Sequence, residues 1–169
     1  MNPKLKFDET KIKSYADCYS YQIDDNIIAL KEDILNRGFL TKDDLTQIAY
    51  WKAPRSSIHV QKNTDEYIVE ITKFALSTKC ERTKIQILTN LDGVSWPTAS
   101  VILHFFDAGE YPILDFRALW SITVKVPTQY TFAFWWNYVE FCRSLANNNN
   151  VSMRILDQAL WQYSKENQK

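Results

Sequence analysis

The sequence predicts an all-α protein of about eight or nine helices, formed as a single domain over residues 1–169. Apolar residues recur at helical spacing in nearly every segment, and no stretch shows the sustained alternation that is typical of a half-buried strand. Residue types that favour helix ends stand at the borders of these segments. With 46% hydrophobic and 14% aromatic residues, the chain has enough apolar surface for one sizeable core.

The expected helices begin in the N-terminal half of the chain. Residues 26–36 form a broad apolar face, and this helix ends at Gly38, because glycine readily takes the left-handed conformation of helix C-termini. Thr41 and Asp44 resemble a capping box, which predicts a second helix that continues to about Lys52.

Further helices follow at regular intervals. A third begins near Asn63 or Thr64 and continues to about Leu76, a long aromatic helix covers about residues 130–146, and the last begins at Ser152. We expect the last helix to pack back on the N-terminal helices. Its apolar face consists of Ile155, Leu156, Leu160 and Trp161.

Residues 85–106 have the pattern of a helix, a tight turn and a second helix. Gly93 can take the left-handed conformation that ends the first helix, and Pro97 suits the first turn of the second, which continues to about Phe106. The chain has only three glycines, so a glycine here indicates a conformational requirement. The unpaired N–H groups and the helix dipole at the start of the second helix favour a bound phosphate.

Asp115 is the candidate catalytic residue. Pro112 pushes Tyr111 toward an extended conformation, and Asp115 then falls at the N-cap of a new helix over about residues 115–123. Backbone N–H bonds and the helix dipole favour the ionised carboxylate. Such an anion suits a sugar that becomes cationic as its glycosidic bond breaks. The alternative is that Asp115 only caps a helix.

The sequence of residues 91–115, LDGVSWPTASVILHFFDAGEYPILD, resembles without a gap the signature of the helix-hairpin-helix DNA glycosylases, most closely that of the adenine-mismatch glycosylases. The resemblance implies a two-lobed helical fold in which the middle of the chain forms one subdomain and the terminal parts form the other, with the base pocket between them. It also implies that Asp115 is catalytic. The residues that it assigns to the DNA backbone are Leu91, Gly93, Val94, Ser95, Trp96 and Thr98, with a monovalent cation as a candidate ligand of the hairpin.

Three departures from the family pattern refine these expectations. Ser95 replaces the usual second glycine of the hairpin, which predicts a strained or reshaped turn. Pro97 stands where bifunctional members have a Schiff-base lysine, so an enzyme of this kind would be monofunctional and would use water as its nucleophile. The cluster-binding cysteines of the iron–sulfur members are absent, so we expect neither a cluster nor another metal cofactor.

Residues that would contact the base are harder to assign. Trp51 and Arg55 lie at a helix end where related enzymes enter the DNA, and both are candidates for a pocket or wedge residue. His104 is a candidate pocket residue or a partly buried side chain. Arg117 is a candidate to orient Asp115 or bind a phosphate, or to form an ion pair with Asp157. Four tryptophans have strongly apolar surroundings and are expected to pack in the core: Trp120, Trp135, Trp136 and Trp161.

The chain contains 20 basic and 20 acidic residues, so DNA binding would require a local basic patch. A candidate patch precedes the hairpin, and its alternative is a solvated helix surface. It consists of Lys73, Lys79, Arg82 and Lys84.

The sequence has no apolar signal segment and no stretch long enough to span a membrane, which predicts a cytoplasmic protein. Three widely spaced cysteines predict reduced, buried thiols rather than a disulfide framework.

The leading hypothesis is therefore a monofunctional DNA glycosylase that flips and excises a damaged or modified base, in base excision repair or in defence against modified DNA. The alternative is a noncatalytic helix-hairpin-helix module that binds DNA, and a third hypothesis is a helical protein–protein adaptor. The pattern does not identify the base.

Overall fold

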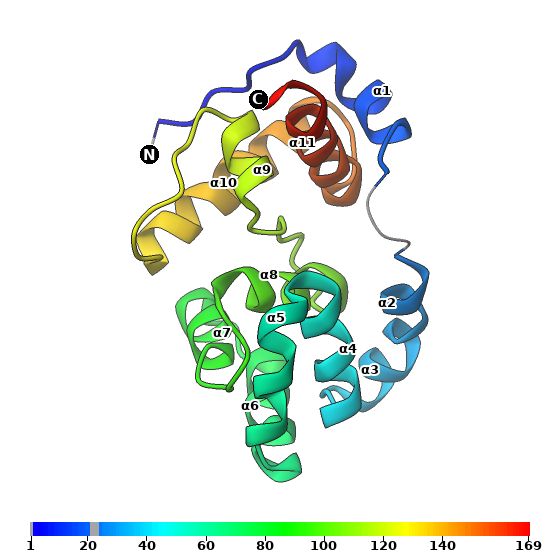
Figure 1. Cartoon of the computed structure of the whole chain (residues 1–169), viewed down its shortest axis with the longest axis vertical. Helices are drawn as coiled ribbons and strands as arrows, with labels where there is room; N and C mark the ends of the chain where they lie inside the picture. Colours follow the sequence, from blue (N-terminus) through cyan, green and yellow to red (C-terminus); the bar gives the residue numbers. More distant parts are fainter. Residues whose placement is uncertain (1, 21–23) are drawn as a thin grey trace. The chain divides into compact units, whose positions relative to one another are not determined.

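The computed structural model describes residues 2–20 and 24–169 of the chain. Within these ranges it contains helices α1–α11 and two short 3-10 helices, and it contains no strand (Figure 1). The predicted all-α class is confirmed. The described helices outnumber the eight or nine expected, because short helices α1 and α5 had no strong periodic signal and one expected helix is divided in two.

The chain divides into two compact units. The terminal unit comprises Met1–Tyr21 and Glu110–Lys169, and the middle unit comprises Gln22–Gly109.

The middle unit is built around α8. Helices α3, α4 and α7 pack against α8, and most of its side chains are buried. This packing fixes the position of α8, which is the second helix of the predicted hairpin, within the unit. The elements of this unit are α2 (Asp25–Ala29), α3 (Lys31–Arg37), α4 (Lys42–Lys52), α5 (Pro54–Ser57), η2 (Ile58–Lys62), α6 (Asp65–Ser77), α7 (Glu81–Leu88) and α8 (Trp96–Phe106).

Local capping chemistry sets several helix ends of the middle unit. The predicted capping box of Thr41 and Asp44 is present at the start of α4, and Thr64 accepts a hydrogen bond from the Tyr67 N–H at the start of α6. Gly38 ends α3 with φ of 76°. The expected helix over 26–36 is interrupted at Leu30, which serves both as the C-cap of α2 and as the N-cap of α3.

The terminal unit is held together by α11. This helix packs along α1 and α9, as expected for the last helix of the chain. Ser152 caps it by accepting a hydrogen bond from the Ile155 N–H, and the Ser121 hydroxyl donates to the Leu160 carbonyl at 2.6 Å. The elements of this unit are η1 (Glu9–Lys11), α1 (Ile12–Asp17), α9 (Phe116–Ser121), α10 (Phe132–Asn148) and α11 (Met153–Asn167).

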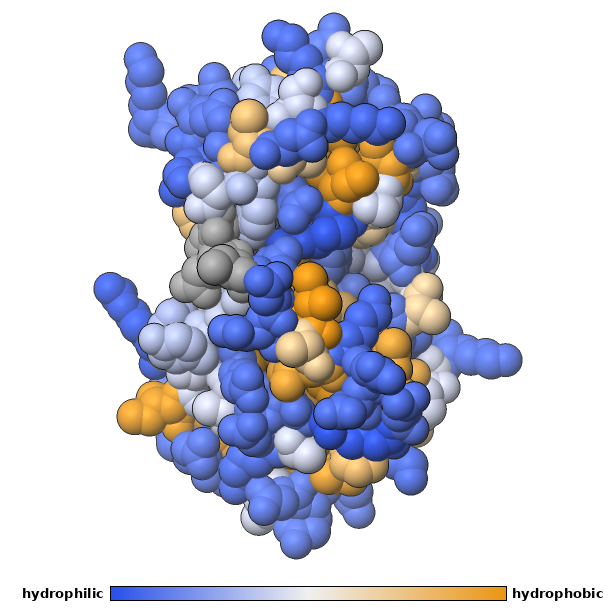
Figure 2. Space-filling model, turned by 90° about the vertical axis from the view of Figure 1, so that its right-hand side faces the viewer, coloured by the Kyte–Doolittle hydropathy of each residue, from blue (hydrophilic) through white to orange (hydrophobic). Residues whose placement is uncertain are grey.

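Large apolar side chains that remain exposed come from several elements of both units. Figure 2 shows, on the face that carries α2 and α3, small apolar groups separated by hydrophilic side chains. No described helix is long and apolar enough to cross a membrane. The exposed large apolar residues are Ile28, Leu35, Tyr50, Ile58, Tyr67, Phe74, Phe116 and Val126.

The three cysteines are free thiols, but only Cys142 is buried, so the prediction of buried thiols is wrong for Cys18 and Cys80. Burial raises the pKa of the Cys142 thiol far above its ordinary value. Hydrogen bonds from the side chain and backbone of Thr83 lower the pKa of the Cys80 thiol. Cys80 therefore has more thiolate near neutral pH than an ordinary cysteine.

We predict that a thiol-specific reagent modifies Cys18 and Cys80 in the folded protein and Cys142 only after unfolding. Alkylation of Cys80 should also persist to lower pH than that of a simple thiol in solution, because its lowered pKa preserves the thiolate. Mass spectrometry of the modified peptides across a pH series measures both effects. Modification of Cys142 under native conditions would contradict the described packing.

Candidate nucleic-acid interface and catalytic carboxylate

The hairpin of the middle unit consists of α7, a turn over residues 89–95, and α8. Helix α7 ends at Leu88, so the expectation that Gly93 ends it is wrong; Gly93 lies within the turn, with φ of 84°. A Cβ atom at this position would lie 2.9 Å from the Val60 backbone nitrogen and 3.1 Å from the Ser56 carbonyl oxygen. Glycine is therefore required both by the left-handed conformation and by the close approach of α5 and η2.

The side chain of Asn63 holds the turn in place, and the sequence pattern did not reveal this role. Its Oδ1 atom accepts a hydrogen bond from the Asp92 N–H at 2.9 Å, and its Nδ2 atom donates to the carbonyl oxygens of Asp92 and Val60 at 3.0 and 2.9 Å. Asn63 is only 5% exposed. Because the oxygen and the nitrogen of this buried amide both bond to the turn, the turn cannot move without breaking hydrogen bonds that water does not replace.

The side chains predicted to grip the DNA backbone are mostly anchors of the hairpin. Leu91, Val94 and Thr98 are buried, so their side chains are not available to contact DNA. Ser95 has φ of −91° and ψ of 174°, an extended conformation open to any residue, so the strain predicted from its replacement of glycine is absent. Trp96 is half-buried at the first position of α8.

The start of α8 retains unused hydrogen-bond donors. Within the part of the chain that the structure describes, the backbone N–H groups of Gly93 and Ser95 donate to no acceptor, and both residues are at least partly exposed. They precede a helix of 11 residues, and Pro97 has no N–H of its own. This end of α8 therefore combines free donors with the positive end of a helix dipole.

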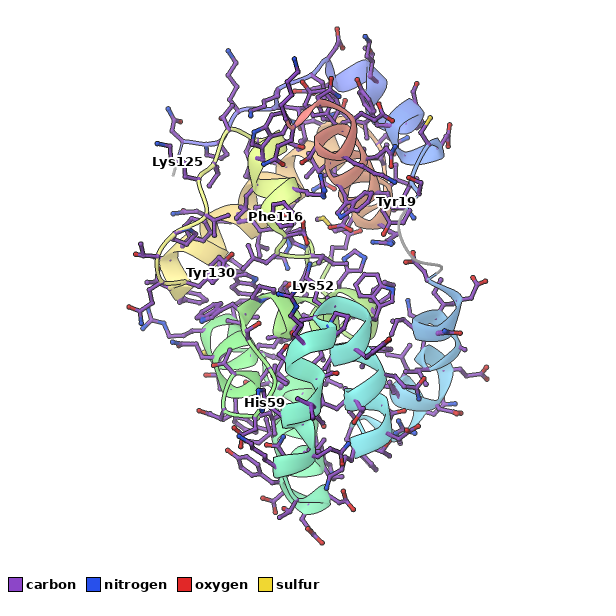
Figure 3. All side chains as sticks on the ribbon, in the orientation of Figure 1. Tyr19, Lys52, His59, Phe116, Lys125 and Tyr130 are labelled. Carbon is purple, nitrogen blue, oxygen red and sulfur yellow. The ribbon has the colours of Figure 1, made fainter. Side chains whose placement is uncertain are left out.

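The cations around the hairpin differ from those expected. Lys84 is buried and forms an ion pair with Asp107 at 2.6 Å, so it is not part of an exposed basic patch. Arg55, His59 and Lys62 are exposed on α5 and η2, the segment that packs against the turn; Figure 3 labels His59 there. Their role depends on a contact between distant parts of the chain, and local sequence does not reveal it. Three cations of the predicted patch do remain exposed: Lys73, Lys79 and Arg82.

Asp115 lies in the terminal unit at the predicted N-cap of α9. Its Oδ1 atom accepts a hydrogen bond from the Arg117 N–H at 2.9 Å, and the residue is half-buried. A carboxylate in this place stabilises the first turn of the helix and keeps part of its surface accessible.

The extended segment before Asp115 is fixed by two buried side chains. The Ile113 N–H donates to Asp157 Oδ1 at 3.2 Å, and the Tyr138 hydroxyl donates to the Ile113 carbonyl at 3.0 Å. Arg154 holds Asp157 through an ion pair at 2.6 Å. Both backbone groups of Ile113 are thus satisfied from α10 and α11, which sets the direction in which the chain reaches Asp115.

Two tyrosines near Asp115 were not predicted. Burial raises the pKa of Tyr138 well above its usual range, and the nearby Cys142, Asp157 and Asp115 raise it further. Tyr130, labelled in Figure 3 just before α10, is half-buried, and burial followed by the negative charge of Asp115 raises its pKa. Tyr130 therefore supplies a neutral phenol in the electrostatic neighbourhood of Asp115.

The remaining candidates have different outcomes. Trp51 is buried and meets the ring of Phe105 edge-on at 5.9 Å, so it is a core residue rather than an exposed wedge. His104 is partly buried on α8. The predicted alternative of an ion pair between Arg117 and Asp157 is wrong, because Asp157 pairs with Arg154.

Of the tryptophans expected in the core, Trp135 is fully buried and stacks on Tyr111 at 5.7 Å. The others are only partly buried, so the core prediction is too broad; they are Trp120, Trp136 and Trp161.

No known protein family, no curated protein and no solved structure matches the chain.

We predict that Gly93→Ala lowers the free energy of unfolding by about 2 kcal/mol or more, because it adds a steric clash to the cost of a left-handed alanine. Gly38→Ala is the matched control: Gly38 has φ of 76°, but no atom lies within 4 Å of the position that a Cβ would occupy there. Urea denaturation of both variants compares the costs. Equal losses of stability would contradict the close approach at the hairpin.

We predict that Tyr138→Phe destabilises the protein by about 1–2 kcal/mol at neutral pH, because the buried Ile113 carbonyl loses its donor. The raised pKa of Tyr138 stabilises the folded state below about pH 10, and that contribution is lost as the pH rises further. The variant should therefore lose stability less steeply at alkaline pH than the wild type.

Denaturation at several pH values tests this, with Tyr50→Phe as the control because Tyr50 is 61% exposed. Identical alkaline profiles for wild type and Tyr138→Phe would show that the buried phenol does not contribute.

Proposed function

We propose that the protein is a monofunctional DNA N-glycosylase in which Asp115 is the catalytic carboxylate. The observation that carries this proposal is the way Asp115 is held. An extended segment fixed through Ile113 places Asp115 at the N-cap of α9. There the carboxylate accepts a hydrogen bond from the Arg117 N–H and stays partly accessible. A fixed anion of this kind is suited to stabilise positive charge that develops close to it.

In the proposed reaction, the target nucleotide leaves the duplex and its sugar lies beside Asp115. The bond between C1′ and the base nitrogen breaks, the electron pair leaves with the base, and the sugar becomes oxocarbenium-like. Asp115 stabilises this cation. Water then adds its oxygen to C1′, and its proton balances the charge on the departing base. Pro97 has no amine for a Schiff base, so the product is an abasic site without strand cleavage at this position.

The hairpin supports DNA as the substrate. The free N–H groups at the start of α8 suit a backbone phosphate, and the exposed Arg55, His59 and Lys62 lie on the segment packed against the turn. The Leu91 and Asp92 carbonyl oxygens each accept one hydrogen bond and keep a second lone pair. A monovalent cation at the turn is compatible with these atoms, and no step of the mechanism depends on it.

The second candidate function is a noncatalytic DNA-binding module. It is favoured by the equal numbers of 20 basic and 20 acidic residues and by the removal of Lys84 into an internal ion pair, because both weaken the general attraction to DNA. This alternative predicts binding to DNA without an abasic product.

We predict that wild-type protein releases a base from at least one member of a panel of damaged, mismatched and naturally modified duplexes, and that Asp115→Asn does not. Asparagine preserves the helix cap but removes the charge. Alkaline cleavage of the product strand reveals abasic sites.

Asp8→Asn is the matched control, because Asp8 also caps a helix in the terminal unit by accepting the Thr10 N–H. This control should retain base release. Equal activity of Asp115→Asn and wild type would eliminate the proposed mechanism, and DNA binding without release from any substrate would favour the noncatalytic module.

A further inference from the structure

Cations alternate with aromatic rings across α9, α11 and the residues that follow α1. We call this surface the cation–aromatic strip. Phe116 and Tyr19, which Figure 3 labels in the terminal unit, stand at its two ends. The strip consists of Phe116, Arg117, Trp161, Lys165, Tyr19 and Arg154.

The contacts within the strip are continuous. The Arg117 guanidinium lies 5.2 Å from the Phe116 ring centre and 5.3 Å from that of Trp161. Lys165 Nζ lies 5.4 Å from the Trp161 ring, and Tyr19 meets Trp161 edge-on at 5.4 Å. Arg117 thus connects α9 to α11, and Trp161 connects α11 to the residues that follow α1.

Arg154 completes the strip at its Tyr19 end. Its guanidinium lies 5.1 Å from the Tyr19 ring and donates a hydrogen bond to the tyrosine hydroxyl at 3.2 Å. Arg154 is also neutralised by its ion pair with Asp157. We therefore assign it to positioning Tyr19 rather than to attracting a ligand.

The other two cations of the strip are electrostatically available. Within the described part of the chain, neither Arg117 nor Lys165 forms an ion pair, and Lys165 is held by a hydrogen bond to the Ser20 hydroxyl at 2.7 Å. Phe116 is 52% exposed, although aromatic side chains usually bury most of their surface. The strip therefore combines two cations outside any ion pair with aromatic surface that is exposed at Phe116.

We propose that the cation–aromatic strip binds an unpaired segment of the DNA strand. Phosphates match Arg117 and Lys165, and bases stack on the rings of Phe116 and Trp161 without regard to sequence. Flexible cations can leave the ring faces for the phosphates when bases take their place. A continuous duplex supplies the phosphates but keeps its bases stacked on each other, so it uses only the charged half of the strip.

This proposal rests on the proposed function, because base flipping by a glycosylase creates an unpaired nucleotide beside Asp115. Phe116 and Arg117 directly follow Asp115 in the chain, so the strip begins at the candidate catalytic residue. The strip would hold the part of the strand that continues from the flipped nucleotide, and it would favour DNA that is already unpaired near the target base.

The test measures DNA binding without chemistry, with the Asp115→Asn substitution present in every protein. Fluorescence anisotropy gives the affinity for a labelled oligothymidylate and for a duplex of equal length over a range of salt concentrations. Replacing Arg117 and Lys165 together by glutamine should weaken single-strand binding about tenfold at low salt and reduce the salt slope by about 1.4, since each phosphate contact contributes about 0.7.

The matched control replaces Lys13 and Lys125 by glutamine. Both are exposed lysines of the terminal unit outside the strip, and Figure 3 labels Lys125. This control should leave single-strand affinity unchanged. Equal weakening by the two charge-matched pairs would overturn the proposal, because it would indicate only general attraction between the protein and DNA.

Substitution of Phe116 separates stacking from charge. Phe116→Ala should weaken single-strand binding about fivefold without changing the salt slope, while Phe116→Tyr should retain it and duplex binding should respond to neither. Equal responses of single strand and duplex to Phe116→Ala would also overturn the proposal. Circular dichroism confirms that each variant is folded. Because no base is released in these measurements, failure of the strip is distinguished from failure of the glycosylase mechanism.

Discussion

The extended segment that leads to Asp115 is held by hydrogen bonds to both backbone groups of Ile113, and the position of the candidate catalytic carboxylate depends on them. Tyr138 and Asp157 supply these bonds from two different helices, and both are buried. Buried polar groups are costly to separate from their partners, so the segment has one favoured path. The raised pKa of Tyr138 extends the range in which its hydroxyl is protonated to more alkaline pH.

The hairpin of the middle unit follows the same principle. One buried amide, that of Asn63, satisfies both backbone groups of Asp92, and the close approach of η2 requires glycine at position 93. In each unit, a short irregular segment with candidate functional atoms is fixed by buried polar side chains that are distant in sequence. Such support keeps donors or a carboxylate at defined positions before a ligand arrives, which lowers the cost of binding.

Local chemistry in the sequence was sufficient for several helix ends. Gly38, Thr41 and Asp115 each act on backbone groups within a few residues, so their roles could be predicted without knowledge of the fold. The all-α class followed from periodicity in the same way.

The predictions that failed all concern residues whose environment depends on long-range contacts. Lys84 was expected on the surface, but it pairs with Asp107 at the far end of α8. Asn63 was identified only as a helix-start candidate, and the nearness of Tyr130 to Asp115 arises from the path of the chain after α9. Charge and burial at these positions are set by packing, which a local pattern does not encode.

The central claim is that Asp115 stabilises a sugar that becomes positively charged. The most direct test compares binding to two duplexes, one with a cationic ring-nitrogen analogue of the abasic sugar and one with its neutral tetrahydrofuran counterpart. This comparison does not require knowledge of the target base. We expect wild-type protein to bind the cationic duplex at least about tenfold more tightly, and Asp115→Asn to lose that preference. Equal affinity of the wild type for the two duplexes would contradict the claim.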